Sequence, residues 1–554
     1  MRCLAWGIGC VLGLAGAAHA QVQVLTAARV HTSDPSRPVA GAFAWDENGR
    51  VLAIGDADDL LARYPDAERI DAAGKTVIPG LIDAHGHLMG LGYALMHADL
   101  VDARDKAEVI ARLREYEKQL PADAWLLGSG WDQNDWPEKD FPTAADLDAA
   151  FPDRPVWLER VDGHAGWANS AALRAASAKS ARPLDGDWQP DGGRIERIDG
   201  QPSGVFVDAA MALVHAVVPA PDETYRRQAL EKALQAAVRN GLTGVHDMGV
   251  SRGDLALMRR LADEGALPLR VDAYADGDGA ALADLCAQGP YRHESGRLSM
   301  RGVKLYVDGA LGSRGAALLE DYSDDPGNRG LLVTEPAALE AAIRKAHGCG
   351  VQVATHAIGD RGNRLVLDTY ARVLGEGAGQ DHRWRIEHAQ VVAPEEMPRF
   401  AALGVIASMQ PTHATSDMPW AQDRLGPVRI TGAYAWQRLR DSGAKLALGS
   451  DFPVESVDPR RGLYAAVTRQ DAAGHPEAGW MPDQRLSAAD ALRGFTADAA
   501  WAAHDENDVG RLAPGLRADF VVLEEDPLAV PGEQLDDLHI RSTWVDGKPV
   551  YEAE

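Results

Sequence analysis

The sequence predicts an α/β protein built on a (β/α)8 TIM barrel, with a small β-sandwich domain formed by both chain ends and an insertion after barrel strand 1. Three observations predict this. Short apolar runs that end in polar residues alternate with helix-like stretches. Both ends of the chain alternate in hydrophobicity and contain turn signals. One long stretch rich in Trp, Asp, Gly and Pro interrupts the barrel pattern.

Residues 1–20 read as a secretory signal peptide. Arg2 gives a positive start, an apolar run follows, and Ala18-His19-Ala20 fits a small-x-small cleavage site. The run is short for a membrane span, although an uncleaved anchor is the alternative. We therefore expect an exported protein, periplasmic or secreted.

Residues 21–76 predict the first part of the β-sandwich. Alternating apolar and polar residues surround Asn48-Gly49, which is a strong hairpin signal. The segment is too short to form a stable sheet by itself, so it requires a partner from elsewhere in the chain.

Residues 486–554 predict a linking helix and the second part of the sandwich. A helix is expected from about Ser487 to Ala503, where Ser487 and Asp490 have capping-box spacing. β-like segments follow, with a turn at Asp546-Gly547.

Residues 77–485 predict the barrel. Its eight candidate strands are 77–87, 241–249, 267–276, 300–309, 351–360, 383–390, 404–413 and 445–453. Their near-continuous Val, Ile, Leu and Ala content is typical of parallel strands buried on both faces. Residues 222–241 and 335–350 have helical periodicity and end in glycine. The interruption at 100–220 predicts a subdomain that shapes the substrate site.

Composition excludes some classes of partner. The 554-residue chain carries a net charge of −26, which argues against nucleic acid and, after signal cleavage, against anionic membranes. The expected partner is a small-molecule substrate. Cys286 and Cys349 are the two cysteines after the signal peptide. Export permits a disulfide between them, although two cysteines do not make a disulfide framework.

Polar residues gather at the expected carboxyl ends of the strands. His85 and His87 are two residues apart on one strand, so both imidazoles can reach one ion. Further candidate ligands end other strands: Lys304, His356, His388 and Asp451. Six such residues on five strands predict a metal centre at the barrel mouth.

These motifs resemble a known family. IDAHGH, THAIGD, RIEHAQ and GSDFP resemble the metal signature of the amidohydrolase superfamily. Other segments are similar to the amidohydrolase family 3 branch, which includes N-substituted formamide deformylases; these are VDGHAGWANSAAL (161–173), KLYVDGALGSR (304–314), HAIGDRGN (356–363) and ADFVVL near the C-terminus. The resemblance covers essentially the whole mature chain, but its motifs do not fix a substrate.

The resemblance implies two divalent metal ions. His85, His87 and Asp451 would bind the more buried ion, and His356 and His388 the second. Lys304 matches the position of a carboxylated lysine that bridges both ions; a free ammonium has only donors and is a poor ligand. The alternative is an uncarboxylated Lys304 and one ion. Imidazole and carboxylate ligands favour Zn²⁺, with Mn²⁺, Fe²⁺ and Ni²⁺ as alternatives.

The expected reaction is hydrolysis of an amide-type carbon–nitrogen bond. Bound ions lower the pKa of water to about 7, and Asp451 would move a proton from water to the leaving nitrogen. The same site could act on an ester, lactone or cyclic amide. A non-catalytic binding or assembly protein is a more distant alternative. A homodimer is a family-level expectation.

Weaker candidates lie around the predicted centre. The residues expected to contact substrate are His164, His413, Trp131 and Arg314, and those expected to orient the ligands or the loop over them are Asp360, Arg361 and Asp308. The tryptophans of the insertion suggest an apolar or aromatic group near the site, although tryptophan also fills cores.

Overall fold

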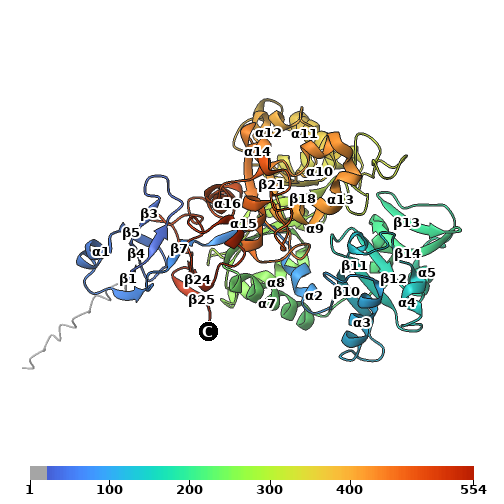
Figure 1. Ribbon diagram of the computed structural model, residues 1–554, viewed down its shortest axis with the longest axis horizontal. Coiled ribbons are helices and arrows are strands. Elements are labelled where there is room, and N and C mark those ends of the chain that lie inside the picture. Colours follow the sequence, from blue (N-terminus) through green and yellow to red (C-terminus); the bar gives the residue numbers. More distant parts are fainter. Residues whose placement is uncertain (1–21) are drawn as a thin grey trace, which may run out of the picture.

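The computed structural model describes residues 22–554, so the predicted signal peptide lies outside the described residues. The barrel forms the centre of the molecule (Figure 1). The sheet containing β1, β4 and β5 lies on one side of it, and the insertion, from β10 to β14, lies on the opposite side.

Eight parallel strands form a nearly closed barrel, which confirms the predicted fold class. In chain order they are β8 (Leu81–Gly86), β15 (Leu242–Val250), β16 (Arg270–Asp276), β18 (Leu298–Tyr306), β19 (Gln352–Ala357), β20 (Arg385–His388), β21 (Ile406–Met409) and β22 (Lys445–Leu448). The first and last strands approach through backbone bonds beyond β22: Asp451 N donates to His85 O at 2.7 Å, and His87 N donates to Phe452 O at 2.9 Å.

Helices alternate with these strands. They are α2 (Leu88–Ala94), α7 (Glu223–Arg239), α8 (Arg252–Asp263), α9 (Ala280–Gln288), α10 (Pro336–Gly348), α11 (Asp360–Leu374), α12 (Met397–Leu403), α13 (Pro411–Arg429), α14 (Trp436–Asp441) and α15 (Pro459–Thr468). The Asp222 side chain caps α7, and Pro336 begins α10. Each of these two helices buries an apolar stripe, as their periodicity predicts. A short strand, β17 (Tyr291–Arg292), pairs with β18.

The predicted linking helix is two helices, α16 (Ala488–Gly494) and α17 (Ala497–Ala502). Ser487 caps the first by accepting from Asp490 N. The break has a tertiary cause, because the Phe495 carbonyl accepts a hydrogen bond from Ile82 N at 2.7 Å, on barrel strand β8. That contact lies far away in the sequence, so helical periodicity alone does not reveal it.

Both chain ends build one two-layer sandwich. One sheet runs β5 (Val51–Gly55), β4 (Ala42–Trp45), β1 (Gln23–Thr26) and β6 (Glu68–Asp71); the other runs β25 (Lys548–Glu552), β24 (Ile540–Val545), β23 (Phe520–Leu523), β7 (Thr76–Pro79), β2 (Arg29–His31) and β3 (Val39–Ala40). Helix α1 (Ala57–Arg63) packs beside the first sheet. Trp45 and Phe520, from opposite ends of the chain, lie 5.6 Å apart between ring centroids.

The expected first barrel strand divides at Gly80. Residues before it join the sandwich as β7, and those after it join the barrel as β8. A side chain at residue 80 would collide with Thr243, because an added Cβ would lie 2.1 Å from Thr243 Oγ1. Glycine therefore lets the chain pass closely from one domain to the other.

The insertion has its own six-stranded sheet, which the sequence did not reveal. Its order is β13 (Gly193–Ile198), β14 (Gln201–Asp208), β12 (Ala165–Ala168), β11 (Val156–Arg160), β10 (Leu126–Trp131) and β9 (Ala98–Asp99). Its helices are α3 (Lys106–Glu117), α4 (Ala144–Asp148), α5 (Ser170–Lys179) and α6 (Ala212–His215). The tryptophans largely form its interior: Trp131, Trp136, Trp157 and Trp167 are each at most 2% exposed.

Cys286 in α9 and Cys349 at the end of α10 form a disulfide. Among the described residues, none of the helices has the length and apolar character needed to span a bilayer.

Candidate metal centre

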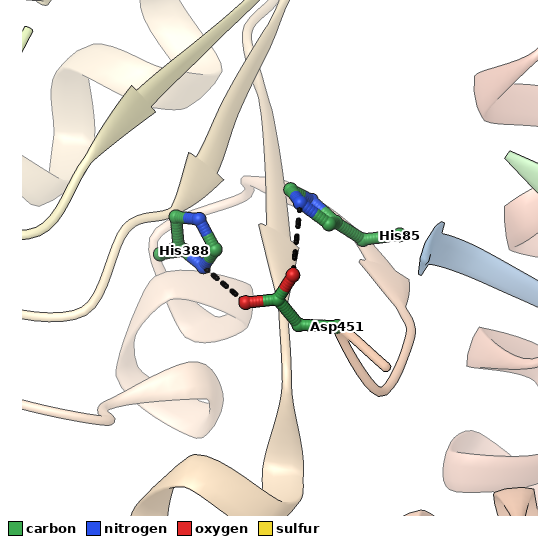
Figure 2. Close-up of side chains that lie close together, drawn as sticks. All are labelled: His85, His388 and Asp451. Atoms are coloured by element: carbon green, nitrogen blue, oxygen red, sulfur yellow. Dashed lines mark ion pairs between the residues drawn. The ribbon is translucent and has the colours of Figure 1, made fainter. Parts of the chain in front are cut away.

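Three buried side chains from different parts of the barrel meet at its mouth. His85 comes from β8, His388 from β20, and Asp451 follows β22. One potential ligand atom from each lies within 4.8 Å of those of the other two. Figure 2 shows both imidazoles directed toward the Asp451 carboxylate.

The other three predicted ligands surround this core. His87 Nε2 lies 3.0 Å from Asp451 Oδ1, and Lys304 Nζ lies 3.0 Å from His85 Nε2. The His356 ring lies 4.6 Å from the His388 ring between centroids. The fold therefore brings all six predicted ligands into one cluster, although they span more than three hundred residues of chain.

Neighbouring acceptors fix which imidazole nitrogen can bind an ion. His85 Nδ1 lies 2.6 Å from Glu387 Oε2, and a carboxylate accepts. Nδ1 therefore donates and leaves the Nε2 lone pair available beside Lys304. Gln410 Oε1 lies 2.9 Å from His388 Nδ1 and accepts a hydrogen bond from it, which leaves the Nε2 lone pair of His388 available.

Sequence reasoning missed Glu387 and Gln410. Glu387 is wholly buried and also pairs with buried Arg385 at 2.7 Å. The signal was in RIEH, because alternate residues of a strand share a face, so charged residues at 385 and 387 of a buried strand require interior partners.

The electrostatics suit metal binding. Burial lowers the pKa of His85, His356 and His388 well below the ordinary value, so each imidazole is neutral and has a free lone pair. Burial also lowers the pKa of Lys304, which favours the neutral amine that carboxylation requires. Asp451 Oδ1 is buried without a hydrogen bond of normal geometry. Imidazoles and a carboxylate with unused lone pairs are a fitting donor set for a divalent cation.

His164 and His413 reach the same region. The His164 ring lies 5.2 Å from the His356 ring, and its Nδ1 lies 2.6 Å from Asp208 Oδ1. Burial lowers the pKa of His164, but the hydrogen bond and the negative charge of Asp208 outweigh it. The pKa of His164 is therefore raised to about 9. His413 Nε2 lies 3.7 Å from Asp451 Oδ2.

Other predicted residues lie elsewhere. Trp131 is fully buried in the insertion and donates to Leu158 O, and Arg314 pairs with Asp324 at 2.9 Å. Neither lines the cavity described below. The expectation of substrate contact therefore finds no support from their positions.

Asp308 and Asp360 both accept hydrogen bonds from backbone amides of loops beside the cluster, and Asp308 Oδ1 also lies 3.7 Å from His356 Nε2. Asp308 accepts from the amides of Ile358, Gly359 and Ala317, which ties the loop after β18 to that after β19. Asp360 accepts from Leu319 N and Arg361 N rather than from His356, and Arg361 is exposed.

A cavity of about 1430 Å³ opens beside the cluster. Its walls come from the barrel loops and from the insertion, and they include His87, His164, His356, His388 and Asp451. This volume exceeds that of a typical small-ligand pocket, which is about 300–1,000 Å³.

Comparison with known proteins agrees with this architecture. The model of the amidohydrolase family matches residues 68–551. The chain is 35% identical over 516 residues to the putative amidohydrolase YtcJ of Bacillus subtilis, covering 91% of this chain and 95% of that one. It is 29% identical over 549 residues to the N-substituted formamide deformylase of Arthrobacter pascens, covering 95% and 97%.

A solved structure extends the likeness to three dimensions. An uncharacterized metal-dependent hydrolase from Pyrococcus horikoshii matches with a TM-score of 0.75 at 29% identity, covering 92% of this chain and 99% of the other.

Proposed function

This chain belongs to the amidohydrolase family, and on that premise we propose that it hydrolyses a carbon–nitrogen bond of a non-peptide or small peptidic amide. The observation that carries the proposal is the buried cluster of His85, His388 and Asp451 at the mouth of a large cavity. The name of the deformylase relative supports an amide rather than an ester.

The proposed metal ligands are His85, His87, Lys304, His356, His388 and Asp451, with Lys304 carboxylated and two ions held. When bound, such ions lower the pKa of water to about 7 and polarise a carbonyl. Asp451 accepts the proton of the attacking water at its carboxylate and passes it to the leaving nitrogen. His164 and His413 contact the substrate from the cavity walls. The products are a carboxylate and an amine.

We further propose zinc as the metal, because neutral imidazoles dominate the donor set. Export to the periplasm or medium, by cleavage after Ala20, also stays a proposal, as does a homodimer.

The test is a hydrolysis screen over formamides, N-acyl amines, dipeptides, N-acyl amino acids and aryl esters, with metal analysis of the same preparation. We expect about two ions per chain and amide cleavage that a chelator abolishes. A protein that holds no metal, or that cleaves only the esters, would contradict the proposal.

A further inference from the structure

One wall of the cavity carries negative charge without matching positive charge. We call it the acidic wall and define it by Asp132, Asp162, Asp417 and Glu455, all of which line the cavity. The first two come from the insertion, Asp417 lies on α13, and Glu455 follows β22. Ser416 Oγ lies 2.6 Å from Glu455 Oε1, so Asp417 and Glu455 lie on the same part of the wall.

Only neutral groups hold Asp417 and Glu455. Asp417 Oδ2 accepts from Tyr434 Oη at 2.6 Å and from Gln390 Nε2 at 3.0 Å, and Glu455 accepts from Ser416. Across residues 22–554, no lysine, arginine or histidine nitrogen lies within 4.0 Å of either carboxylate. Neutral donors orient a carboxylate but leave its charge uncompensated.

The nearest cations already have partners. The side chain of Arg160, which is 1% exposed, bonds both Asp132 and Asp162. Arg461 lies 4.0 Å from Asp536. The acidic wall therefore has four carboxylates and one guanidinium. The whole cavity is lined by thirteen aspartates and glutamates against two arginines and His164, whose raised pKa keeps it protonated.

A second observation points to a ligand at the same place. The hydroxyl of Thr412, a residue 7% exposed, has no hydrogen-bond partner, and His413 Nε2, which lies 3.7 Å from Asp451 Oδ2, has none either. Both residues line the cavity, and they lie within five residues of Asp417 in the first turns of α13. Buried polar groups without partners are uncommon, so a ligand that supplies hydrogen bonds here would satisfy them.

The carboxylates of the acidic wall also repel each other electrostatically. Burial, together with the neighbouring Asp417 and Asp451, raises the pKa of Glu455 to about 8. Burial and Asp132 raise the pKa of Asp417 to about 7. A positive charge placed between them would remove this penalty, whereas an anion would increase it.

We propose that the substrate carries an ammonium or guanidinium group, which binds between Asp417 and Glu455 while its amide lies at the metal centre. This inference rests on the proposed function for the identity of the reacting bond. The recognition of a cation, however, depends on the acidic wall alone, so binding can be measured without turnover.

The test compares two probes of nearly equal size, hexylammonium and 1-hexanol, by calorimetry on the metal-loaded protein at pH 8.5, which lies above both raised pKa values. We expect hexylammonium to bind at least tenfold more tightly. Asp417→Asn and Glu455→Gln should each weaken its binding about tenfold and leave hexanol binding unchanged. Asp102→Asn is the matched control, because Asp102 lines the same cavity at an exposed position outside the acidic wall.

The outcomes separate this inference from the proposed function. Equal binding of the two probes by the unmutated protein would overturn the inference, and this result requires no variant to fold. An equal loss of hexylammonium affinity in Asp102→Asn would also overturn the inference, because the overall negative potential of the cavity would then explain the binding. Selective hexylammonium binding with no amide cleaved in the screen would support the cation subsite and refute the proposed function instead.

Discussion

The two sides of the cavity satisfy their polar groups in different ways. At the metal centre, the side chains stand on barrel strands, and the imidazoles of His85 and His388 have buried partners in Glu387 and Gln410. At the acidic wall, the side chains stand on the insertion and on segments after strands, and Asp417 and Glu455 have no cationic partner. The barrel strands therefore position the reacting groups, whereas the loops and the insertion determine which molecules reach them.

The largest effect is expected for Asp451→Asn, which removes the carboxylate at the metal centre. Asparagine keeps the shape but neither accepts the water proton nor supplies an anionic ligand, so we expect kcat to fall by about 10³-fold or more. Turnover of the best substrate from the screen measures this, together with metal content. Undiminished turnover would show that Asp451 is not the base that accepts the proton of the attacking water.

Metal removal tests the centre as a whole. We expect dialysis against a chelator to abolish hydrolysis and lower the Tm, because a ligand that binds only the folded state stabilises it. Added Zn²⁺ should restore both. An unchanged Tm and rate after verified loss of metal would show that these side chains form a structural network rather than a metal site.

Glu387→Gln tests whether the buried partner of His85 positions that ligand. Loss of such a partner weakens metal affinity about 10–100-fold, and we expect a loss in this range by competition with a chromophoric chelator. Glu506→Gln is the matched control, because Glu506 also pairs with a barrel arginine, Arg383, but does not line the cavity. Similar losses of metal affinity in the two variants would show that removing the ion-pair partner of a buried arginine has a general effect, and that Glu387 does not position His85.

The smallest expected effect is a pH-dependent change in the Tm when Glu455 of the acidic wall is replaced. The folded-state pKa of Glu455, about 8, lies above the unfolded value of about 4.3, so folding binds a proton there. The stability from that proton is complete below pH 4.3 and is lost as pH rises through 8. Glu455→Gln should therefore raise the Tm more at pH 8.5 than at pH 5, by on the order of 1 °C.

The same melts on Glu320→Gln, an exposed glutamate, provide the control. If the Tm difference between Glu455→Gln and the unmutated chain is the same at both pH values, the Glu455 carboxyl is not in the environment described for the acidic wall.

Much of the fold was predictable because it depends on local periodicity. The apolar runs located the eight barrel strands to within a few residues, and the turns at Asn48-Gly49 and Asp546-Gly547 identified the sandwich hairpins. The exceptions have distant causes. Gly80 divides the expected first strand because Thr243 lies against it, and the Phe495 carbonyl interrupts the expected linking helix to bond Ile82.

The insertion was harder to interpret. Its tryptophans suggested an aromatic substrate pocket, but they largely fill the interior around a six-stranded sheet. Composition could not distinguish these roles, because a tryptophan packs equally well in a core and against a ligand.

The order of residues was enough to place the candidate ligands at one barrel mouth, because strand periodicity locates the ends of the strands and barrel enzymes carry their active sites at the carboxyl ends. Which of these groups pair with one another follows from the folded arrangement alone. Glu387 meets His85 across 302 residues, and Arg160 bonds two carboxylates of the acidic wall, whereas Asp417 and Glu455 have no cationic nitrogen within 4.0 Å. Electrostatic pairing depends on distance in space, which the order of residues along a chain does not specify.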